Sequence, residues 1–344
     1  MKIGLVGYQG SGKSTLFHWL TGVTPDPSVA HTGQSAMTVV PEPRIDSLCE
    51  IYQPKKISRA SIELVDTPGL SRDQRGNASK LALIREATSL VLVLAAFDGS
   101  DPMADLASFS EDLMLADLEI VSGRLERLEA SLKKPLPKAE REVLEFERET
   151  LLSVNAALEA GRPIRESELS EEQRKATKAF RLLGEKPRLA VVNTADDEAD
   201  PSRFAGLATE DVPVSCIPVG LEVELERMDP EDRKEFEEEM GVGGSDRDGL
   251  VRAMLANSGY HLFFTASEKE VRTWLLRQGG TALEAADGIH SDLARGFIRA
   301  EVMTVSDLLR LGSEREVKAH NLMRQEPKDY VVGDEDILHI RFSV

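Results

Sequence analysis

Short apolar runs recur along the chain, and each ends at a polar turn. Three of them, residues 3–6, 61–65 and 189–192, have the length and composition of strands buried in a parallel sheet. Directly after the first run, Leu16, Trp19 and Leu20 are spaced as one face of a helix. A strand that leads through a short loop into a helix is the unit of α/β folds, and the pattern therefore predicts that fold class.

The middle of the chain has the spacing of two long helices. Apolar residues follow one another in steps of three and four at Leu118, Val121, Leu125, Leu128 and Leu132. Pro135 and Pro137 interrupt the pattern, which resumes at Leu144, Leu151, Val154 and Leu158. We expect two antiparallel helices, either a hairpin packed on the core or an arm that binds a partner.

The last part of the chain changes pattern again. From Leu262 onward, short β-rich runs surround one helical stretch, and residues 337–342 alternate as a final strand. The longest apolar stretches, such as residues 90–97, are well short of the ~20 residues that a membrane-spanning helix requires. Residues 1–7 do not resemble a secretion signal, so we expect a cytoplasmic protein without membrane contact.

The charge is unevenly distributed over the 344 residues. The formal net charge is −18, and residues 187–260 alone carry 7 basic and 18 acidic side chains. Such a chain is not attracted nonspecifically to nucleic acid, and no DNA partner is expected. The two cysteines, Cys49 and Cys216, are interpreted as reduced thiols, and the six histidines show no ligand-like spacing.

Residues 7–14 read Gly-Tyr-Gln-Gly-Ser-Gly-Lys-Ser and match the phosphate-binding loop pattern between a strand and a helix. Glycines allow backbone N–H groups to converge on a β-phosphate, and the new helix directs its positive dipole end to the same charge. Lys13 is expected to bridge the β- and γ-phosphates, and Ser14 to bind Mg²⁺. The predicted nucleotide-binding residues here are Gly7, Gly10, Ser11, Gly12, Lys13, Ser14 and Thr15. The alternative is a glycine-rich turn that binds no phosphate.

A second motif follows Lys13 by 53 residues, at the end of the predicted strand 61–65, and reads Asp66-Thr67-Pro68-Gly69. By itself this pattern is typical of a turn. In this position Asp66 is expected to hold Mg²⁺, and Gly69 to donate its N–H to the γ-phosphate. Residues 193–196, Asn-Thr-Ala-Asp, follow a third predicted strand and form either a base-binding motif or an ordinary turn.

These motifs resemble those of the YchF family, the Obg-like ATPases among the Obg-related translation-factor GTPases. The similarity covers nearly the whole chain. It is carried by residues 12–17, 40–44, 51–56, 116–119, 124–128, 263–266, 269–272, 289–292, 295–298 and 328–332.

The resemblance implies three structural parts. A P-loop nucleotide hydrolase domain takes residues 1–100 and 187–260, an α-helical hairpin of coiled-coil type is inserted at 101–186, and a β-grasp domain of the TGS type takes 261–344. It also implies Mg²⁺, ATP or GTP, and a ribosome, ribosomal RNA or ribosomal protein surface as partner.

Catalysis is where the chain departs from better-known hydrolases. Leu70 follows Gly69, where Ras-like enzymes place a glutamine that orients the attacking water. The family shares this apolar residue, and a histidine in the loop after the next strand is its suggested substitute. Here that loop, residues 98–101, contains no histidine, which leaves Lys13 and Gly69 as catalytic candidates. We expect a hydrolase of slow intrinsic rate, or alternatively a nucleotide-sensing scaffold with little or no turnover.

The base and switch residues also depart from the usual patterns. The family typically has a glutamate in place of Asp196, whose carboxylate can accept hydrogen bonds from guanine, while Thr194 replaces the lysine that packs over the base in GTPases. The sequence therefore predicts a base site at Asn193, Thr194 and Asp196 without deciding between ATP and GTP. Thr32 is the candidate for the threonine that closes over Mg²⁺.

Overall fold

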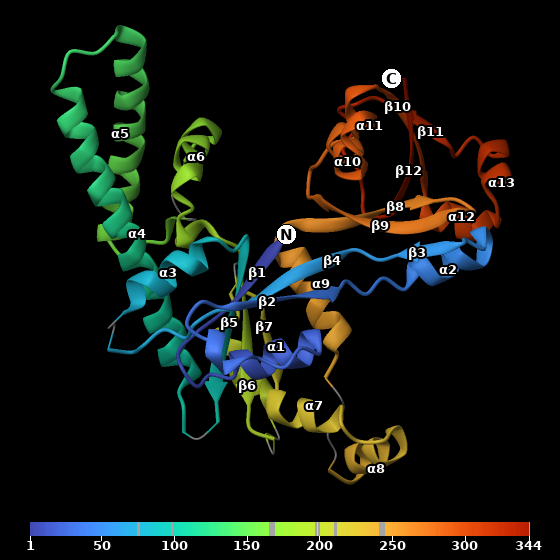
Figure 1. The fold of residues 1–344 in the computed structure, drawn as a ribbon, viewed down its shortest axis with the longest axis horizontal. Helices are drawn as coiled ribbons and strands as arrows, with labels where there is room; N and C mark the ends of the chain where they lie inside the picture. Colours follow the sequence, from blue (N-terminus) through green and yellow to red (C-terminus); the bar gives the residue numbers. More distant parts are fainter. Residues whose placement is uncertain are drawn as a thin grey trace. The chain divides into compact units, whose positions relative to one another are not determined.

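The computed structural model describes residues 1–73, 76–97, 99–164, 169–196, 198, 200–209, 212–240 and 245–343. The chain forms two compact units, Met1–Ala36 with Glu63–Ser245 and Met37–Ile62 with Asp246–Val344 (Figure 1). Each unit contains most of one sheet that has six strands among the described residues. Asp98, in the loop that lacks a histidine, lies outside the described residues.

The first sheet has the order β2-β4-β1-β5-β6-β7. Its strands are β1 (Lys2–Val6), β2 (Gln34–Val39), β4 (Ser61–Asp66), β5 (Ser89–Ala96), β6 (Arg188–Thr194) and β7 (Val214–Ile217). The α-helices of this unit are α1 (Lys13–Thr21), α3 (Asn77–Arg85), α4 (Pro102–Leu132), α5 (Lys138–Glu159), α6 (Glu171–Thr177), α7 (Val219–Leu225) and α8 (Pro230–Met240). Short 3-10 helices are η1 (Pro27–Val29), η3 (Lys178–Phe180), η4 (Leu183–Glu185) and η5 (Pro201–Leu207).

The parallel pairing predicted from the apolar runs is confirmed. Strand β1 pairs in parallel with β4 and β5, and β6 pairs in parallel with β5 and β7. All eight residues of β5 are buried, as expected for a strand covered on both faces. In a parallel sheet the carboxyl ends of the strands share one edge, so the loops after β1, β4 and β6 begin at the same edge.

The two predicted middle helices are present as α4 and α5, which stand side by side in Figure 1. Their apolar positions form one buried cluster that includes Val121, Leu125, Leu128, Leu151, Val154 and Leu158. The spacing of three and four residues therefore predicts which side chains form the contact between α4 and α5, because it places one apolar stripe along each helix.

The second unit contains a mixed sheet with the order β11-β10-β12-β8-β9-β3. Its strands are β3 (Lys56–Ser58), β8 (Tyr260–Ala266), β9 (Glu270–Arg277), β10 (Phe297–Thr304), β11 (Arg324–Glu326) and β12 (Asp336–Phe342). Its helices are α2 (Arg44–Tyr52), α9 (Arg247–Asn257), α10 (Ala282–Ile289), α11 (Ser291–Arg295), α12 (Val305–Leu311) and α13 (Glu314–Ala319).

Helices cover both faces of this second sheet. The last strand, predicted to alternate between buried and exposed residues, is therefore buried on both faces. Ile337 packs in a cluster with Ile45 and Leu48 of α2, whereas its neighbour Leu338 packs in another cluster with Ala285 of α10. Strand β12 therefore buries consecutive residues rather than alternating ones. Residues 37–62, which supply α2 and β3, group with the C-terminal part of the chain.

No helix in the described part of the chain is both long enough and apolar enough to cross a lipid bilayer.

Asp117 of α4 is a fully buried carboxylate that joins three elements of the first unit. Its Oδ1 accepts hydrogen bonds from Arg85 Nη1 at 2.6 Å and from the backbone N–H of Leu183 at 2.9 Å. Its Oδ2 accepts from the N–H of Gly184 at 2.7 Å. These bonds fasten the base of the hairpin to α3, which supplies Arg85, and to η4, which supplies the two backbone donors.

The substitution Asp117→Ala should lower the free energy of unfolding by about 3–5 kcal/mol, since it leaves the Arg85 guanidinium, whose side chain is only 11% exposed, without its carboxylate partner. Urea denaturation of the purified protein measures this. As a control, Glu142→Ala removes an exposed pair with Lys138 and should change stability by less than about 0.5 kcal/mol. Equal effects of the two substitutions would contradict the role assigned to Asp117.

Candidate functional site

The phosphate-binding loop connects β1 to α1 at the carboxyl edge of the first sheet. Two of its glycines lie where no side chain fits. A Cβ on Gly7 would lie 2.5 Å from the carbonyl oxygen of Val93, and a Cβ on Gly12 would lie 2.2 Å from Nδ2 of Asn193. Both glycines also have positive φ, at 142° and 95°, so the backbone conformation and the lack of space for a Cβ both require glycine.

Lys13 is held inside this loop. Its Nζ donates a hydrogen bond to the carbonyl oxygen of Tyr8 at 2.6 Å and to Ser11 Oγ at 3.4 Å, and only 6% of the residue is exposed. Burial lowers the pKa of Lys13 to about 8; Asp66 raises this pKa and the Lys80 ammonium lowers it. Asp66 offsets only part of the effect of burial on the Lys13 ammonium. An anion bound beside Lys13 would supply further negative charge and stabilise the ammonium form.

Ser14 and Asp66 are brought together, as the two motifs predict. Ser14 Oγ donates to Asp66 Oδ2 at 2.6 Å, while the buried Oδ1 of Asp66 accepts no hydrogen bond. Burial raises the pKa of Asp66, against the lowering effects of the Ser14 hydrogen bond and the Lys13 charge. A buried carboxylate oxygen without a donor is suited to bind a cation.

These two residues fit Mg²⁺ rather than a metal bound by protein alone. Carboxylate and hydroxyl oxygens are the hard donors that Mg²⁺ takes, and Mg²⁺ usually completes its shell with phosphate oxygens and water. No cluster of three or more His, Cys, Asp or Glu side chains that could hold an ion exists among the described residues. A cation at Asp66 would therefore need most of its ligands from a phosphate and from water.

The loop after β4 packs directly on the phosphate-binding loop. The N–H of Leu70 donates to the carbonyl oxygen of Gly7 at 3.0 Å, and the N–H of Gln9 donates to the carbonyl oxygen of Leu70 at 3.1 Å. A Cβ on Gly69 would lie 2.9 Å from both Gln9 Cα and Lys13 Nζ. Only glycine fits at position 69 without movement of the loop or of Lys13.

Leu70 has no exposed surface and packs in the core cluster with Tyr8, Ile84 and Phe109. The position at which Ras-like enzymes carry a water-orienting glutamine is thus a core position in this protein.

Asn193 connects β6 to two loops. Its Nδ2 donates to the carbonyl oxygen of Ser11 at 3.2 Å, and its Oδ1 accepts from the N–H of Val219 at 3.1 Å. Thr194 is buried, whereas Asp196 is exposed, with a carboxylate oxygen 3.5 Å from where a Cβ on Gly220 would lie. The predicted base-site residues therefore differ in their surroundings. The Asn193 amide is bonded to the phosphate-binding loop, whereas the Asp196 carboxylate is exposed beside the start of α7.

The Thr32 hydroxyl makes no hydrogen bond to the Ser14–Asp66 pair among the described residues. Its hydroxyl donates to the carbonyl oxygen of Val29 at 3.0 Å, and it lines a pocket of about 150 Å³ with Lys2, Gly4 and Pro68. Thr15, the last residue predicted for the loop, lies half-buried in the first turn of α1.

Three side chains beside these loops, those of Tyr8, Arg72 and Lys80, make contacts that no sequence pattern predicts. The Tyr8 hydroxyl donates to Asp112 of α4 at 2.9 Å, and the Arg72 guanidinium lies over the Tyr8 ring at 4.8 Å and pairs with Asp105. Lys80 of α3 donates to the carbonyl oxygen of Gly69 at 2.8 Å. The signal was absent because each contact joins residues from separate segments without a fixed spacing.

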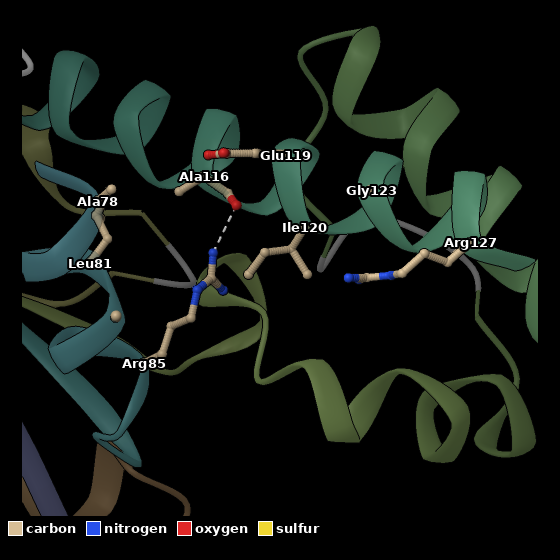
Figure 2. Close-up of a pocket in the computed structure, with 9 residues that line it drawn as sticks. Ala78, Leu81, Arg85, Ala116, Glu119, Ile120, Gly123 and Arg127 are labelled. Carbon is tan, nitrogen blue, oxygen red and sulfur yellow. Dashed lines mark hydrogen bonds between the residues drawn. The ribbon is translucent and has the colours of Figure 1, made fainter.

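A pocket of about 390 Å³ lies elsewhere, between α3 and α4. Figure 2 shows Arg85 donating to the backbone of Ala116 at its wall, with Leu81 and Ile120 beside it. None of the residues that line it belongs to the phosphate-binding loop or to residues 66–70.

Two family models match this chain, one in its N-terminal part and one in its C-terminal part. Residues 2–122 match a family model described as 50S ribosome-binding GTPase. Residues 260–343 match a model named for the C-terminal part of YchF GTPases and described as a protein of unknown function.

Several known relatives are similar along their full length. The ribosome-binding ATPase YchF of Bacillus subtilis is 35% identical over 372 residues, which cover 99% of this chain and 99% of that protein. The Obg-like ATPase 1 of Oryza sativa subsp. indica is 34% identical over 373 residues, which cover 100% of this chain and 92% of that protein.

The solved structure of the Schizosaccharomyces pombe YchF GTPase has a TM-score of 0.84 to this chain at 24% identity, covering 99% of this chain and 97% of that one. It confirms the predicted fold class, an α/β P-loop domain with an inserted helical hairpin and a C-terminal β-grasp domain.

The contact between Gly12 and Asn193 is testable. Gly12→Ala should weaken binding of Mg²⁺-nucleotide by roughly a hundredfold, because the new Cβ displaces the Asn193 amide from the loop. Gly22→Ala is the matched control, since Gly22 also has positive φ, at 71°, but has open space around it. Titration with a fluorescent nucleotide measures both, and similar losses in the two variants would show that backbone strain alone is responsible.

Proposed function

The chain belongs to the YchF family, and we propose that it is a Mg²⁺-dependent nucleoside triphosphatase of slow intrinsic rate that works with the ribosome. Two kinds of support lead to this proposal. The relatives that match over their full length are named ribosome-binding or Obg-like ATPases. The site itself combines a buried lysine, a hydroxyl and a carboxylate at one edge of the sheet.

The observation that carries the proposal is the Ser14–Asp66 pair with its unused carboxylate oxygen. Ser14 Oγ and Asp66 are the protein groups that would hold Mg²⁺, Ser14 directly and Asp66 directly or through water. Mg²⁺ at this place would neutralise charge on the β- and γ-phosphates. In the nucleotide complex, Ser14 would turn its hydroxyl oxygen from Asp66 toward the metal.

The phosphates would be bound by the loop around Lys13. Backbone N–H groups of residues 10–15 surround the start of α1, where the helix dipole favours negative charge. Lys13 would exchange its bond to the Tyr8 carbonyl for the β- and γ-phosphates. Among the described residues, the N–H of Gly69 donates to no acceptor, which suits it to a γ-phosphate oxygen.

The base would lie between Asn193 and Asp196. Asn193 fixes the phosphate-binding loop relative to α7, and the exposed Asp196 carboxylate can accept from the N1–H and exocyclic amine of guanine. Thr194 is too short and too buried to cover the base as a lysine does. The substrate is accordingly ATP or GTP.

A competition titration with Mg²⁺-ATP and Mg²⁺-GTP distinguishes these bases. A tenfold preference for GTP, about 1.4 kcal/mol, would assign guanine recognition to Asp196. Parity or a preference for ATP would mean that Asp196 does not select the base.

One observation favours a second function, a nucleotide-sensing scaffold with little turnover. Leu70 is fully buried, so no side chain at that position can orient the attacking water. The described residues of the loop between β5 and α4 contain no histidine. Both functions share the same nucleotide site and differ only in hydrolysis.

The ribosome would be contacted by the helical hairpin at residues 101–186 and by the TGS domain at residues 261–344, with the nucleotide state changing how they bind. We place the protein in the cytoplasm on the same ground. This part of the proposal relies on what the relatives are named rather than on a surface of this chain.

Hydrolysis is tested by a time course of phosphate release from ATP and GTP. Lys13→Ala should lower the rate by roughly two orders of magnitude, and removal of Mg²⁺ with EDTA should lower it to a similar extent. Lys138→Ala, at a side chain that is 90% exposed on α5, should leave the rate unchanged. A rate for the unmodified protein no higher than the protein-free blank would favour the scaffold.

A further inference from the structure

Lys80 is a second cation beside the residue that faces the γ-phosphate in the proposed function. It lies in α3, and its Nζ donates to the carbonyl oxygen of Gly69 at 2.8 Å. Lys13 Nζ is also close to Gly69, since a Cβ on this glycine would lie 2.9 Å from it. The two ammonium groups therefore flank one glycine.

This arrangement is held in place by Asn77, in the first turn of α3. The N–H of Ser71 donates to Asn77 Oδ1 at 2.9 Å, and Asn77 Nδ2 donates to the carbonyl oxygen of Ser71 at 2.9 Å. Asn77 is 5% exposed. Because the loop from Gly69 to Ser71 is fastened to this turn, Lys80, three residues further along α3, stays beside Gly69.

Two like charges beside one residue repel each other, and an anion that lies near both offsets this repulsion. Lys80 contributes to the lowered pKa of Lys13, which agrees with their proximity. No ion pair of Lys80 with a carboxylate occurs in the described part of the chain, and Asp66 raises the pKa of Lys13. The site thus holds more positive charge than its own acidic groups balance.

Phosphoryl transfer needs a cation for the charge that develops on the γ-phosphate, and some hydrolases supply it from their own chain. The buried Leu70 cannot help to orient water, so other groups of this site must supply what transition-state stabilisation there is. Lys80 has the charge, the position and a weakly engaged donor, since a backbone carbonyl is its hydrogen-bond acceptor.

We propose that Lys80 is a catalytic residue that binds the γ-phosphate. When a triphosphate is bound, its Nζ moves from the Gly69 carbonyl to a γ-phosphate oxygen, opposite Lys13. Lys80 stabilises the charge there and transfers no proton. Water forms the new bond to phosphorus while the bond from phosphorus to the β–γ bridging oxygen breaks. The products are the nucleoside diphosphate, which keeps the bridging oxygen, and inorganic phosphate, and the proton lost by the water passes to the released phosphate or to solvent. The assignment rests on the proposed function.

The test compares Lys80→Ala and Lys80→Arg with the exposed control Lys138→Ala. Binding of Mg²⁺ with the imidotriphosphate analogues of ATP and GTP is measured next to binding of ADP and GDP. Lys80→Ala should weaken triphosphate binding at least about tenfold and change diphosphate binding less than about threefold, because only the triphosphate has a γ-phosphate. Lys80→Arg should retain most of the triphosphate preference, since it keeps the charge.

Single-turnover hydrolysis by the same variants gives the second readout. Lys80→Ala should slow the chemical step by roughly a hundredfold, and Lys80→Arg and Lys138→Ala should stay within about fivefold of the unmodified protein. Equal losses of triphosphate and diphosphate binding, with a lowered Tm of the nucleotide-free protein, would reduce Lys80 to a structural support of Gly69 and overturn the proposal.

The results also distinguish a failure of the role proposed for Lys80 from a failure of the proposed nucleoside triphosphatase function. A protein that binds nucleotide but does not hydrolyse it would overturn the enzymatic function and the catalytic role of Lys80, and the ratio of triphosphate to diphosphate affinity would still decide whether Lys80 binds the γ-phosphate. An unmodified protein that binds no nucleotide would overturn both. An unchanged ratio in Lys80→Ala would overturn the role of Lys80 alone.

Discussion

Two backbone hydrogen bonds between the phosphate-binding loop and the loop after β4 hold Lys13, Ser14 and the residues from Asp66 to Gly69 close together. They join Leu70 to Gly7 and to Gln9, at 3.0 and 3.1 Å. Because of them, Gly69 lies against Lys13, and Asp66 remains within hydrogen-bond distance of Ser14. The same bonds place the Leu70 side chain in the core. The close contact of the two loops and the missing water-orienting side chain therefore have one structural cause.

The phosphate-binding loop is also supported by β6 and by α4. Asn193 holds the phosphate-binding loop through Ser11, and Tyr8 links it to α4 through Asp112. Arg72 extends this support by lying over the Tyr8 ring while pairing with Asp105 of α4. The base of the helical hairpin is thus packed on the phosphate-binding loop, so a change in that loop acts directly on α4.

The chain path joins the site to the second unit. Residues 37–62 leave the first sheet after β2 and return to it in β4, and in between they supply α2 and β3 to the second unit. Thr32 precedes this segment and Asp66 follows it. The loop that begins at Asp66, which is proposed to meet Mg²⁺ and the γ-phosphate, is therefore covalently continuous with a segment whose packing partners are in the C-terminal part of the chain.

The sequence by itself determined the elements and the chemical type of the site. The runs before Gly7 and Asp66 and the stripe along residues 118–132 could be predicted because strands, loops and helices depend on spacing within a few residues. The meeting of Ser14 and Asp66 has another reason: both follow strands of a parallel sheet, whose carboxyl ends share one edge.

Only the tertiary structure decided which distant residues surround that site and which surfaces are buried. The contact of Lys80 with Gly69, the burial of Leu70 and the two covered faces around β12 depend on segments that have no fixed spacing in sequence. Thr32 had the right residue type, but its hydroxyl bonds to its own turn. Local sequence patterns specify local conformation, whereas the charges and the packing around a site depend on how the whole chain folds.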